Sequence, residues 1–331
     1  MNVIEAENLA KTFRVRQKEK GMKGSLQAIL RPRIKEVQAV DGISFSVEAG
    51  EMLAFIGPNG AGKSTTIKML TGILYPDGGR ARVLGIDSAK QRKRLAYEIG
   101  TVFGQKEQLW THLTPYDNFR FFGAIYDIPG GETEGRIREL ADTFELDSFL
   151  NTPVRNLSLG QRIRCEIVAS LIHRPKVLFL DEPTIGLDPV VKENIRALIK
   201  QMTRELGPTI FLTSHDVGDI EKLCRRIIIV NSGRIVLDDS MDHLKHHYLN
   251  RKIVEAKLGE ETALPAAEGI TLLKQRGSQV RFQVDTGRLP INEALHLIDA
   301  ENLEDINISN IPLETIITDI YKAEGREEKA V

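Results

Sequence analysis

The segment from Gly57 to Ser64 fits the pattern G-x-x-x-x-G-K-[ST]. It follows the apolar run Met52 to Ile56, which is typical of a buried strand, and it precedes apolar residues at helical spacing. The glycines let backbone N–H groups converge on an anion, and the N-terminus of the following helix adds positive potential. The segment therefore predicts an α/β domain with a phosphate-binding loop between a strand and a helix.

Loops of this pattern hold the phosphates of a nucleotide together with Mg²⁺. We therefore expect a nucleotide and Mg²⁺ as ligands, with Lys63 reaching the β- and γ-phosphates and Ser64 binding the metal ion. The residues expected to surround the nucleotide are Gly57, Asn59, Gly60, Ala61, Gly62, Lys63, Ser64 and Thr65. The alternative is a glycine-rich turn with a chance lysine, and the flanking strand and helix argue against it.

Two adjacent acids, Asp181 and Glu182, follow the apolar run Val177 to Leu180. Acids at the end of a buried strand are costly unless they are paired or have a chemical task. Asp181 suits Mg²⁺, bound directly or through water, and Glu182 is placed to polarise the attacking water as a general base. The alternative is a pair of solvated acids at the start of a loop, and the phosphate-binding loop favours the catalytic interpretation.

Strand-like and helical runs alternate up to about residue 240, which predicts a largely parallel sheet with helices. Residues of about 106–165 contain helical and aromatic-rich patterns without a clear strand, so we expect an inserted helical subdomain there. We assign residues 1–245 to the main domain and residues 246–331 to a small α+β accessory domain, because strand and helix patterns restart after a polar helix near residue 245.

The composition is that of an ordinary globular chain, with 41% hydrophobic and 27% charged residues. The net charge of −1 does not suggest a nucleic-acid partner. No apolar run approaches the roughly 20 residues that a membrane-spanning helix needs. If the protein works at a membrane, we expect another chain to supply the membrane-spanning part.

The run Leu157 to Gln161, which reads Leu-Ser-Leu-Gly-Gln, resembles the signature of ABC (ATP-binding cassette) proteins. The resemblance implies a P-loop NTPase fold of the ABC cassette type, with the signature in the helical subdomain. It also implies that Ser158, Gly160 and Gln161 contact the γ-phosphate held by an opposite subunit. We therefore expect a homodimer or a pseudo-symmetric heterodimer of nucleotide-binding domains, with Ser158 as the N-cap of the following helix.

Other family motifs follow in the expected order, and the resemblance covers roughly residues 3–240. Gln105 resembles the Q-loop glutamine, which senses Mg²⁺ and the attacking water and relays to the membrane partner. Asp188 lies in a segment that resembles the D-loop, and His215 resembles the switch histidine that contacts the γ-phosphate. Phe13 stands where the family has an aromatic residue that stacks on adenine.

Three positions depart from the family pattern. Leu159 replaces the commonest glycine of the signature, Gln105 lacks the usual proline before it, and Phe13 replaces the commoner tyrosine. None of these changes removes a group with a chemical task, so we expect the chain to hydrolyse ATP.

The stretch from Phe103 to Trp110 and the appended domain resemble ATPases of the daunorubicin-resistance and sodium-exporter type. This resemblance implies a separate multi-span membrane permease, outward transport and a peripheral position on the cytoplasmic face of the membrane. Two alternatives stay open, an import ATPase and a non-transport ABC protein. The single uninterrupted cassette favours transport, because translation factors of the family usually carry two cassettes and chromosome proteins split theirs.

Residues 14–36 form a basic insert with eight Lys or Arg and two Glu, a net charge of +6. Such a composition is most often a solvated loop. It is also compatible with a contact to anionic headgroups or to the cytoplasmic loops of a permease.

Overall fold

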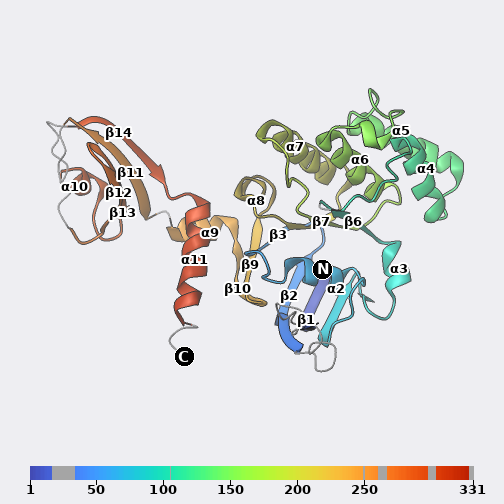
Figure 1. The fold of residues 1–331 in the computed structure, drawn as a ribbon, viewed down its shortest axis with the longest axis horizontal. Coiled ribbons are helices and arrows are strands. Elements are labelled where there is room, and N and C mark those ends of the chain that lie inside the picture. Colours follow the sequence, from blue (N-terminus) through green and yellow to red (C-terminus); the bar gives the residue numbers. More distant parts are fainter. Residues whose placement is uncertain (17–33, 105, 249, 260–266, 297–302, 328–331) are drawn as a thin grey trace, which may run out of the picture. The chain divides into compact units, whose positions relative to one another are not determined.

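The computed structural model describes residues 1–16, 34–104, 106–248, 250–259, 267–296 and 303–327. The chain divides into two compact units, Met1–Asp238 and Asp239–Val331. The colours of Figure 1 follow the sequence from blue at the N-terminus to red at the C-terminus. The sequence patterns had placed this division after residue 245. The structural division comes earlier, since helix α9 (Met241–Tyr248) groups with the second unit.

A six-stranded sheet with the order β10-β9-β3-β8-β7-β6 forms the centre of the first unit. Its strands are β3 (Met52–Ile56), β6 (Ile99–Phe103), β7 (Val177–Asp181), β8 (Thr209–Thr213), β9 (Arg226–Asn231) and β10 (Arg234–Ser240). The strands from β9 to β6 run parallel, and nearly all residues of β3, β7 and β8 are buried. Parallel strands present their carboxyl ends at one edge, so the segments after β3, β6, β7 and β8 meet there.

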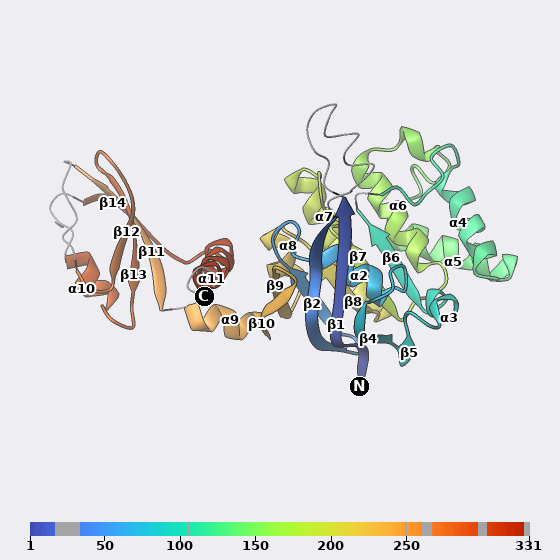
Figure 2. The same cartoon turned by 60° about the horizontal axis from the view of Figure 1, so that its bottom comes forward.

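A second, antiparallel sheet of the first unit was not predicted from the sequence. It has the order β2-β1-β4-β5 and contains β1 (Asn2–Arg16), β2 (Ile34–Glu48), β4 (Gly78–Val83) and β5 (Ile86–Asp87). Figure 2 shows β1 and β2 side by side. Phe45 of β2 packs on Phe55 and Phe211 of the parallel sheet, with ring centroids 5.6 and 6.0 Å apart. The two sheets therefore share one hydrophobic core.

Seven α-helices of the first unit lie in its described residues: α2 (Lys63–Leu70), α3 (Arg92–Ala96), α4 (Pro115–Ile125), α5 (Gly130–Thr143), α6 (Leu159–Leu171), α7 (Pro189–Leu206) and α8 (Val217–Leu223). A short 3-10 helix spans Val154–Asn156. Figure 1 shows α4, α5 and α6 grouped together, where the helical subdomain of about 106–165 was expected, and α6 continues to Leu171. None of the helices in the described part of the chain is long and apolar enough to cross a membrane.

The second unit contains an antiparallel sheet with the order β12-β13-β11-β14. Its elements are α9, β11 (Arg251–Leu258), β12 (Ile270–Arg276), β13 (Gln279–Asp285), α10 (Ile291–His296), β14 (Leu303–Asn310) and α11 (Leu313–Glu327). One face of the sheet forms a small core around Val254, Phe282 and Val284, to which Ala294 of α10 contributes. This unit is α+β, as its sequence patterns indicate.

Candidate functional site

The loop after β3 turns sharply into α2. Gly60 and Gly62 have φ angles of +85° and +103°, a left-handed region that other residues adopt at a cost. A Cβ atom on Gly62 would lie 2.3 Å from the carbonyl oxygen of Ala39, so the loop also needs glycine for space. Of the other predicted loop residues, Gly57 and Ala61 are buried, Thr65 is half-buried, and Asn59, Gly60 and Ser64 are exposed.

Lys63 is the first residue of α2 and its side chain is buried within the loop. Its Nζ atom donates to the carbonyl oxygens of Gly57 at 2.7 Å and Pro58 at 3.2 Å. Burial lowers the pKa of Lys63, and the negative charges of Glu182 and Asp181 oppose this shift. The loop therefore holds a cation at its centre, beside the two acids.

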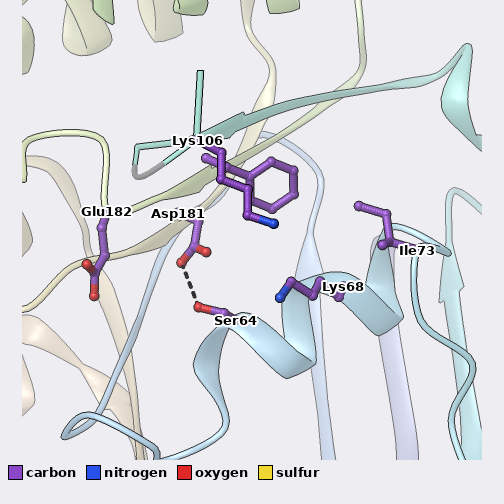
Figure 3. Close-up of a pocket in the computed structure, with 7 residues that line it drawn as sticks. Ser64, Lys68, Ile73, Lys106, Asp181 and Glu182 are labelled. Carbon is purple, nitrogen blue, oxygen red and sulfur yellow. Dashed lines mark hydrogen bonds between the residues drawn. The ribbon is translucent and has the colours of Figure 1, made fainter. Parts of the chain in front are cut away.

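A cavity of about 190 Å³ opens between α2 and the ends of β6 and β7. Its lining residues are Ser64, Lys68, Ile73, Phe103, Lys106, Asp181 and Glu182. Figure 3 shows Asp181 and Glu182 on one side, Lys68 and Ile73 on the other, and Lys106 above them. The sequence motifs did not indicate Lys68 and Lys106, which add two positive charges to a cavity that contains two acids.

Asp181 lies at the end of β7 opposite the start of α2. Its Oδ1 atom accepts from the hydroxyl of Thr213 at 2.5 Å and lies 3.4 Å from the hydroxyl oxygen of Ser64. Carboxylate and hydroxyl oxygens are the ligands that Mg²⁺ prefers. Ser64 and Asp181 thus fit the predicted metal, and Thr213 orients the carboxylate, a role that the sequence motifs did not indicate.

Glu182 has a φ of +55°, an uncommon backbone conformation for a residue other than glycine. Its N–H donates to the carbonyl oxygen of Thr213 at 3.0 Å, which fixes this conformation. The Nδ1 atom of His215 lies 3.5 Å from its Oε1 atom. The predicted base and the predicted switch histidine therefore meet at the same edge of the sheet.

Gly104 packs directly on the backbone of Glu182. Its N–H donates to the carbonyl oxygen of Asp181 at 2.9 Å, and a Cβ atom on Gly104 would lie 2.2 Å from the carbonyl oxygen of Glu182. The predicted Q-loop glutamine, Gln105, lies outside the described residues, and its roles toward Mg²⁺ and the attacking water stay predictions.

Phe13, the predicted adenine-stacking residue, lies on β1 opposite Val37 of β2. Its side chain is 37% exposed, and the Nζ atom of Lys11 lies 5.9 Å from its ring centroid. An exposed aromatic ring is available for stacking, and the contact with adenine stays a prediction.

The signature residues begin α6. Ser158 is the N-cap, its hydroxyl accepts from the N–H of Gln161 at 3.3 Å, and the Gln161 side chain accepts from the N–H of Ser158 at 2.9 Å. Gly160 packs on Val191 of α7, since a Cβ atom there would lie 2.5 Å from Val191 Cγ1. Asp188 is the N-cap of α7 and accepts from the N–H of Val191 at 3.0 Å. The signature helix α6 and the helix α7 that follows the D-loop segment are thus in contact within one chain.

Comparisons with known proteins identify the family of this chain. A family model described as "ABC transporter" matches residues 40–185. The daunorubicin resistance ATP-binding protein DrrA2 of Streptomyces coeruleorubidus is 31% identical over 316 residues, which cover 91% of this chain and 96% of that protein. The chain belongs to the family of ABC transporter ATP-binding proteins. The resemblance inferred from the signature is therefore confirmed.

Two further comparisons concern the extent of the ABC match and the fold. The probable multidrug ABC transporter ATP-binding protein YbhF of Escherichia coli is 37% identical over 225 residues, which cover 67% of this chain but only 38% of YbhF. A dimeric ATP-binding cassette, solved in a post-hydrolysis state with ADP and Pi, superposes with a TM-score of 0.60 at 25% identity. The superposed region covers 72% of this chain and 98% of that cassette. The predicted fold class is confirmed. The predicted enzyme class, an ATPase, is also confirmed, because it is the enzyme class of the ABC family.

Glu166 is a buried acid that the ABC motifs did not indicate. It lies on α6, is 4% exposed, and accepts from the N–H of Gln108 at 3.4 Å. Burial raises its pKa to about 7, while the bond from Gln108 and the charge of Arg162 oppose the shift. This carboxyl joins the signature helix to the segment that follows Gln105.

We expect Glu166→Gln to raise the free energy of unfolding at pH 8 by about 1 to 3 kcal/mol and to change little at pH 5. Because the folded state raises the pKa of Glu166, the folded protein binds more protons than the unfolded one between the ordinary value of 4.5 and about 7. Stability of the wild type therefore falls as pH rises through this window, and glutamine removes the loss.

Urea unfolding followed by the fluorescence of Trp110, the single tryptophan of the chain, measures this difference in the first unit. Glu132→Gln, at an exposed position on α5, is the control and should leave the pH dependence unchanged. Equal stability of Glu166→Gln and wild type at pH 8 would contradict the prediction.

Proposed function

We propose that this chain binds and hydrolyses ATP at the cavity beside Lys63 and that it powers a separate membrane permease as its ATP-binding subunit. The observation that carries the proposal is the meeting of Ser64, Asp181, Glu182 and His215 at the edge of the sheet where the phosphate-binding loop ends. The family membership makes ATP the expected nucleotide.

Each residue has a distinct task in the proposed reaction. Lys63 would hold the β- and γ-phosphates, and Ser64 and Asp181 would hold the metal ion. Bound Mg²⁺ would neutralise charge on the phosphate oxygens. Glu182 accepts a proton from the attacking water as the water oxygen bonds to the γ-phosphorus. The bond from this phosphorus to the β,γ-bridging oxygen breaks, so ADP leaves with that oxygen and phosphate is the second product. His215 orients Glu182 and the γ-phosphate.

Release of phosphate by the purified chain is the direct test. We expect turnover with ATP and Mg²⁺ and none when EDTA removes the metal ion. Absence of turnover under both conditions, with the fold intact by circular dichroism, would overturn the hydrolysis proposal.

The signature is proposed to act on a second cassette. Ser158 is exposed at the N-terminus of α6, where backbone N–H groups and the helix dipole favour an anion. The solved cassette at 25% identity is described as a dimer in its own right. We infer that two cassettes enclose two ATP molecules, so that Ser158, Gly160, Gln161 and Asp188 of each complete the site of the other.

We expect Ser158→Arg to lower ATP turnover by about 10²-fold or more while ATP binding by the monomer is retained. The arginine obstructs the γ-phosphate of the opposite cassette but lies outside the site formed by its own chain. Phosphate release and equilibrium binding of a fluorescent ATP analogue measure the two quantities.

Thr114→Arg is the matched control, because Thr114 is the N-cap of α4 and its loss carries a similar cost in helix stability. Thr114→Arg should keep wild-type turnover. Full turnover in Ser158→Arg would remove the signature from the reaction.

Export is the proposed direction of transport. The names of two relatives refer to multidrug transport and daunorubicin resistance, and resistance is the expected result of outward transport. An import ATPase is the alternative, and a non-transport ABC protein is a second one. The proposed place is the cytoplasmic face of the membrane, and the substrate is expected to be chosen by the permease.

A pull-down from detergent-solubilised native membranes tests the partner. Tagged Glu182→Gln protein with ATP and Mg²⁺ should recover a multi-span permease in stoichiometric amount, identified by mass spectrometry. Ribosomes, nucleic-acid complexes or no membrane protein at all would overturn the transport proposal and leave the hydrolysis proposal intact.

The basic insert of residues 14–36 is a candidate for contact with the membrane or the permease. Residues 17–33 lie outside the described part of the chain, and at its edge Arg14 pairs with Glu36 at 3.0 Å. Charge-neutral variants of the insert that keep full permease association and liposome binding would exclude such a contact.

A further inference from the structure

Asp219 is a fully buried carboxylate on α8, with 0% exposure. Its Oδ1 atom accepts from Nε of Arg196 at 2.6 Å, and its Oδ2 atom accepts from the hydroxyl of Ser214 at 2.8 Å. The hydroxyl of Thr184 donates to the same Oδ2 atom. All three partners are themselves buried, so one carboxylate forms a hydrogen-bonded cluster that is closed to solvent.

The three partners come from three segments that contain predicted site residues. Thr184 lies two residues after Glu182, and Ser214 directly precedes His215. Arg196 lies on α7, whose N-cap is Asp188. Asp219 therefore connects the loop of the base, the loop of the switch histidine and the helix of the D-loop.

Asp216 holds the other side of His215. Its Oδ1 atom accepts from Nη2 of Arg196 at 2.9 Å, and its Oδ2 atom accepts from the ammonium group of Lys192. Both of these residues lie on α7. The N–H of Asp216 donates to the hydroxyl of Ser214 at 3.0 Å. Both chain neighbours of His215 are thus bonded into the cluster, while the His215 side chain is 57% exposed and faces Glu182.

Simple packing of α7 against α8 does not require this arrangement. Buried charges lose their hydration, and apolar residues of similar volume pack helices together at lower cost. A buried ion pair with two hydroxyl partners instead fixes positions and directions, because each bond has a defined geometry.

We infer that Asp219 is a positioning residue that fixes the backbone of His215 relative to Glu182 and Asp188. The inference rests on the proposed hydrolysis function and assigns a residue that does not touch the nucleotide. Loss of the cluster would let the His215 loop shift, and a misplacement of about 1 Å can cost about 10²-fold in rate. ATP binding at Lys63 lies in a different segment and should not change.

The test compares Asp219→Asn with wild type in the full chain. We expect kcat for ATP to fall by about 10- to 100-fold with an unchanged Kd for ATP. Glu193→Gln is the matched control, since Glu193 bonds to Arg196 from the solvent side at 3.2 Å and leaves the buried cluster intact. Wild-type kcat in Asp219→Asn would overturn the inference.

A double variant separates positioning from the loss of a counter-charge. Arg196→Met with Asp219→Leu removes both charges of the buried pair, and Asp216 keeps its ion pair with Lys192, so stability should recover relative to Asp219→Asn. The hydroxyls of Thr184 and Ser214 still lack their common acceptor, so we expect kcat to stay low. Recovery of kcat in the double variant would show that Asp219 serves only to neutralise Arg196.

Hydrogen exchange of residues 213–218 gives a readout that does not depend on hydrolysis. We expect faster exchange of this segment in Asp219→Asn and wild-type exchange in Glu193→Gln. An inactive wild type would overturn the proposed function, whereas unchanged exchange in Asp219→Asn would overturn the inference.

Discussion

Glu182→Gln protein should bind ATP with wild-type affinity, lose hydrolysis by a factor of about 10² to 10⁴, and accumulate as a dimer. Glutamine has the size of glutamate but cannot take a proton from water. The conformation at residue 182 is fixed by its backbone N–H bond to Thr213, which the substitution leaves in place. ATP therefore stays between the two cassettes, and the step that separates them is blocked.

Phosphate release measures the loss of turnover, and size-exclusion chromatography with light scattering measures the dimer. Glu205→Gln, at an exposed position on α7, is the control and should behave as the wild type. Normal turnover in Glu182→Gln would remove Glu182 as the base. Loss of turnover without dimer would instead contradict the shared nucleotide site.

Lys63→Ala should lower ATP affinity by about 10²-fold or more and abolish measurable turnover. Each charge-assisted hydrogen bond to phosphate contributes about 1.5 to 3 kcal/mol, and the lysine is expected to make two. The Lys63 side chain already lies inside the phosphate-binding loop, where its Nζ atom donates to the carbonyl oxygens of Gly57 and Pro58. Its head group is therefore in place before a nucleotide arrives.

The shift in melting temperature that ATP and Mg²⁺ produce measures this affinity, because a ligand that binds only the folded state stabilises it. Lys68→Ala is the matched control, since Lys68 lies on the same helix and lines the cavity beside Lys63. We expect Lys68→Ala to keep most of the shift. Equal losses in both variants would mean that the overall positive potential, and not the position of Lys63, governs binding.

The sequence motifs indicated most residues of the candidate site because each motif lies in one continuous segment with its own local geometry. The loop at Gly62, the two acids where β7 ends and the N-cap at Ser158 are of this kind. Thr213 could not be found in this way. It reads as an ordinary strand residue, and it reaches Asp181 only because the register of β7 and β8 pairs the two positions.

The same reason explains the missed antiparallel sheet. β1 and β2 are each 15 residues long, and their pairing contains several register shifts. Bulges interrupt the alternation of apolar and polar residues from which an antiparallel strand is predicted. The Asp219 cluster was missed for a different reason, since its members are spread from Thr184 to Asp219 and none has a distinctive spacing.

The close packing of Gly104 gives a steric reason for one departure from the family pattern. Proline is usual before the Q-loop glutamine, but a Cβ atom at residue 104 would lie 2.2 Å from the Glu182 carbonyl oxygen. The two backbone segments are in direct contact here, since the N–H of Gly104 donates to the carbonyl oxygen of Asp181 at 2.9 Å. Any side chain at residue 104 would therefore displace the peptide of Glu182, the proposed base, whereas glycine leaves it in place.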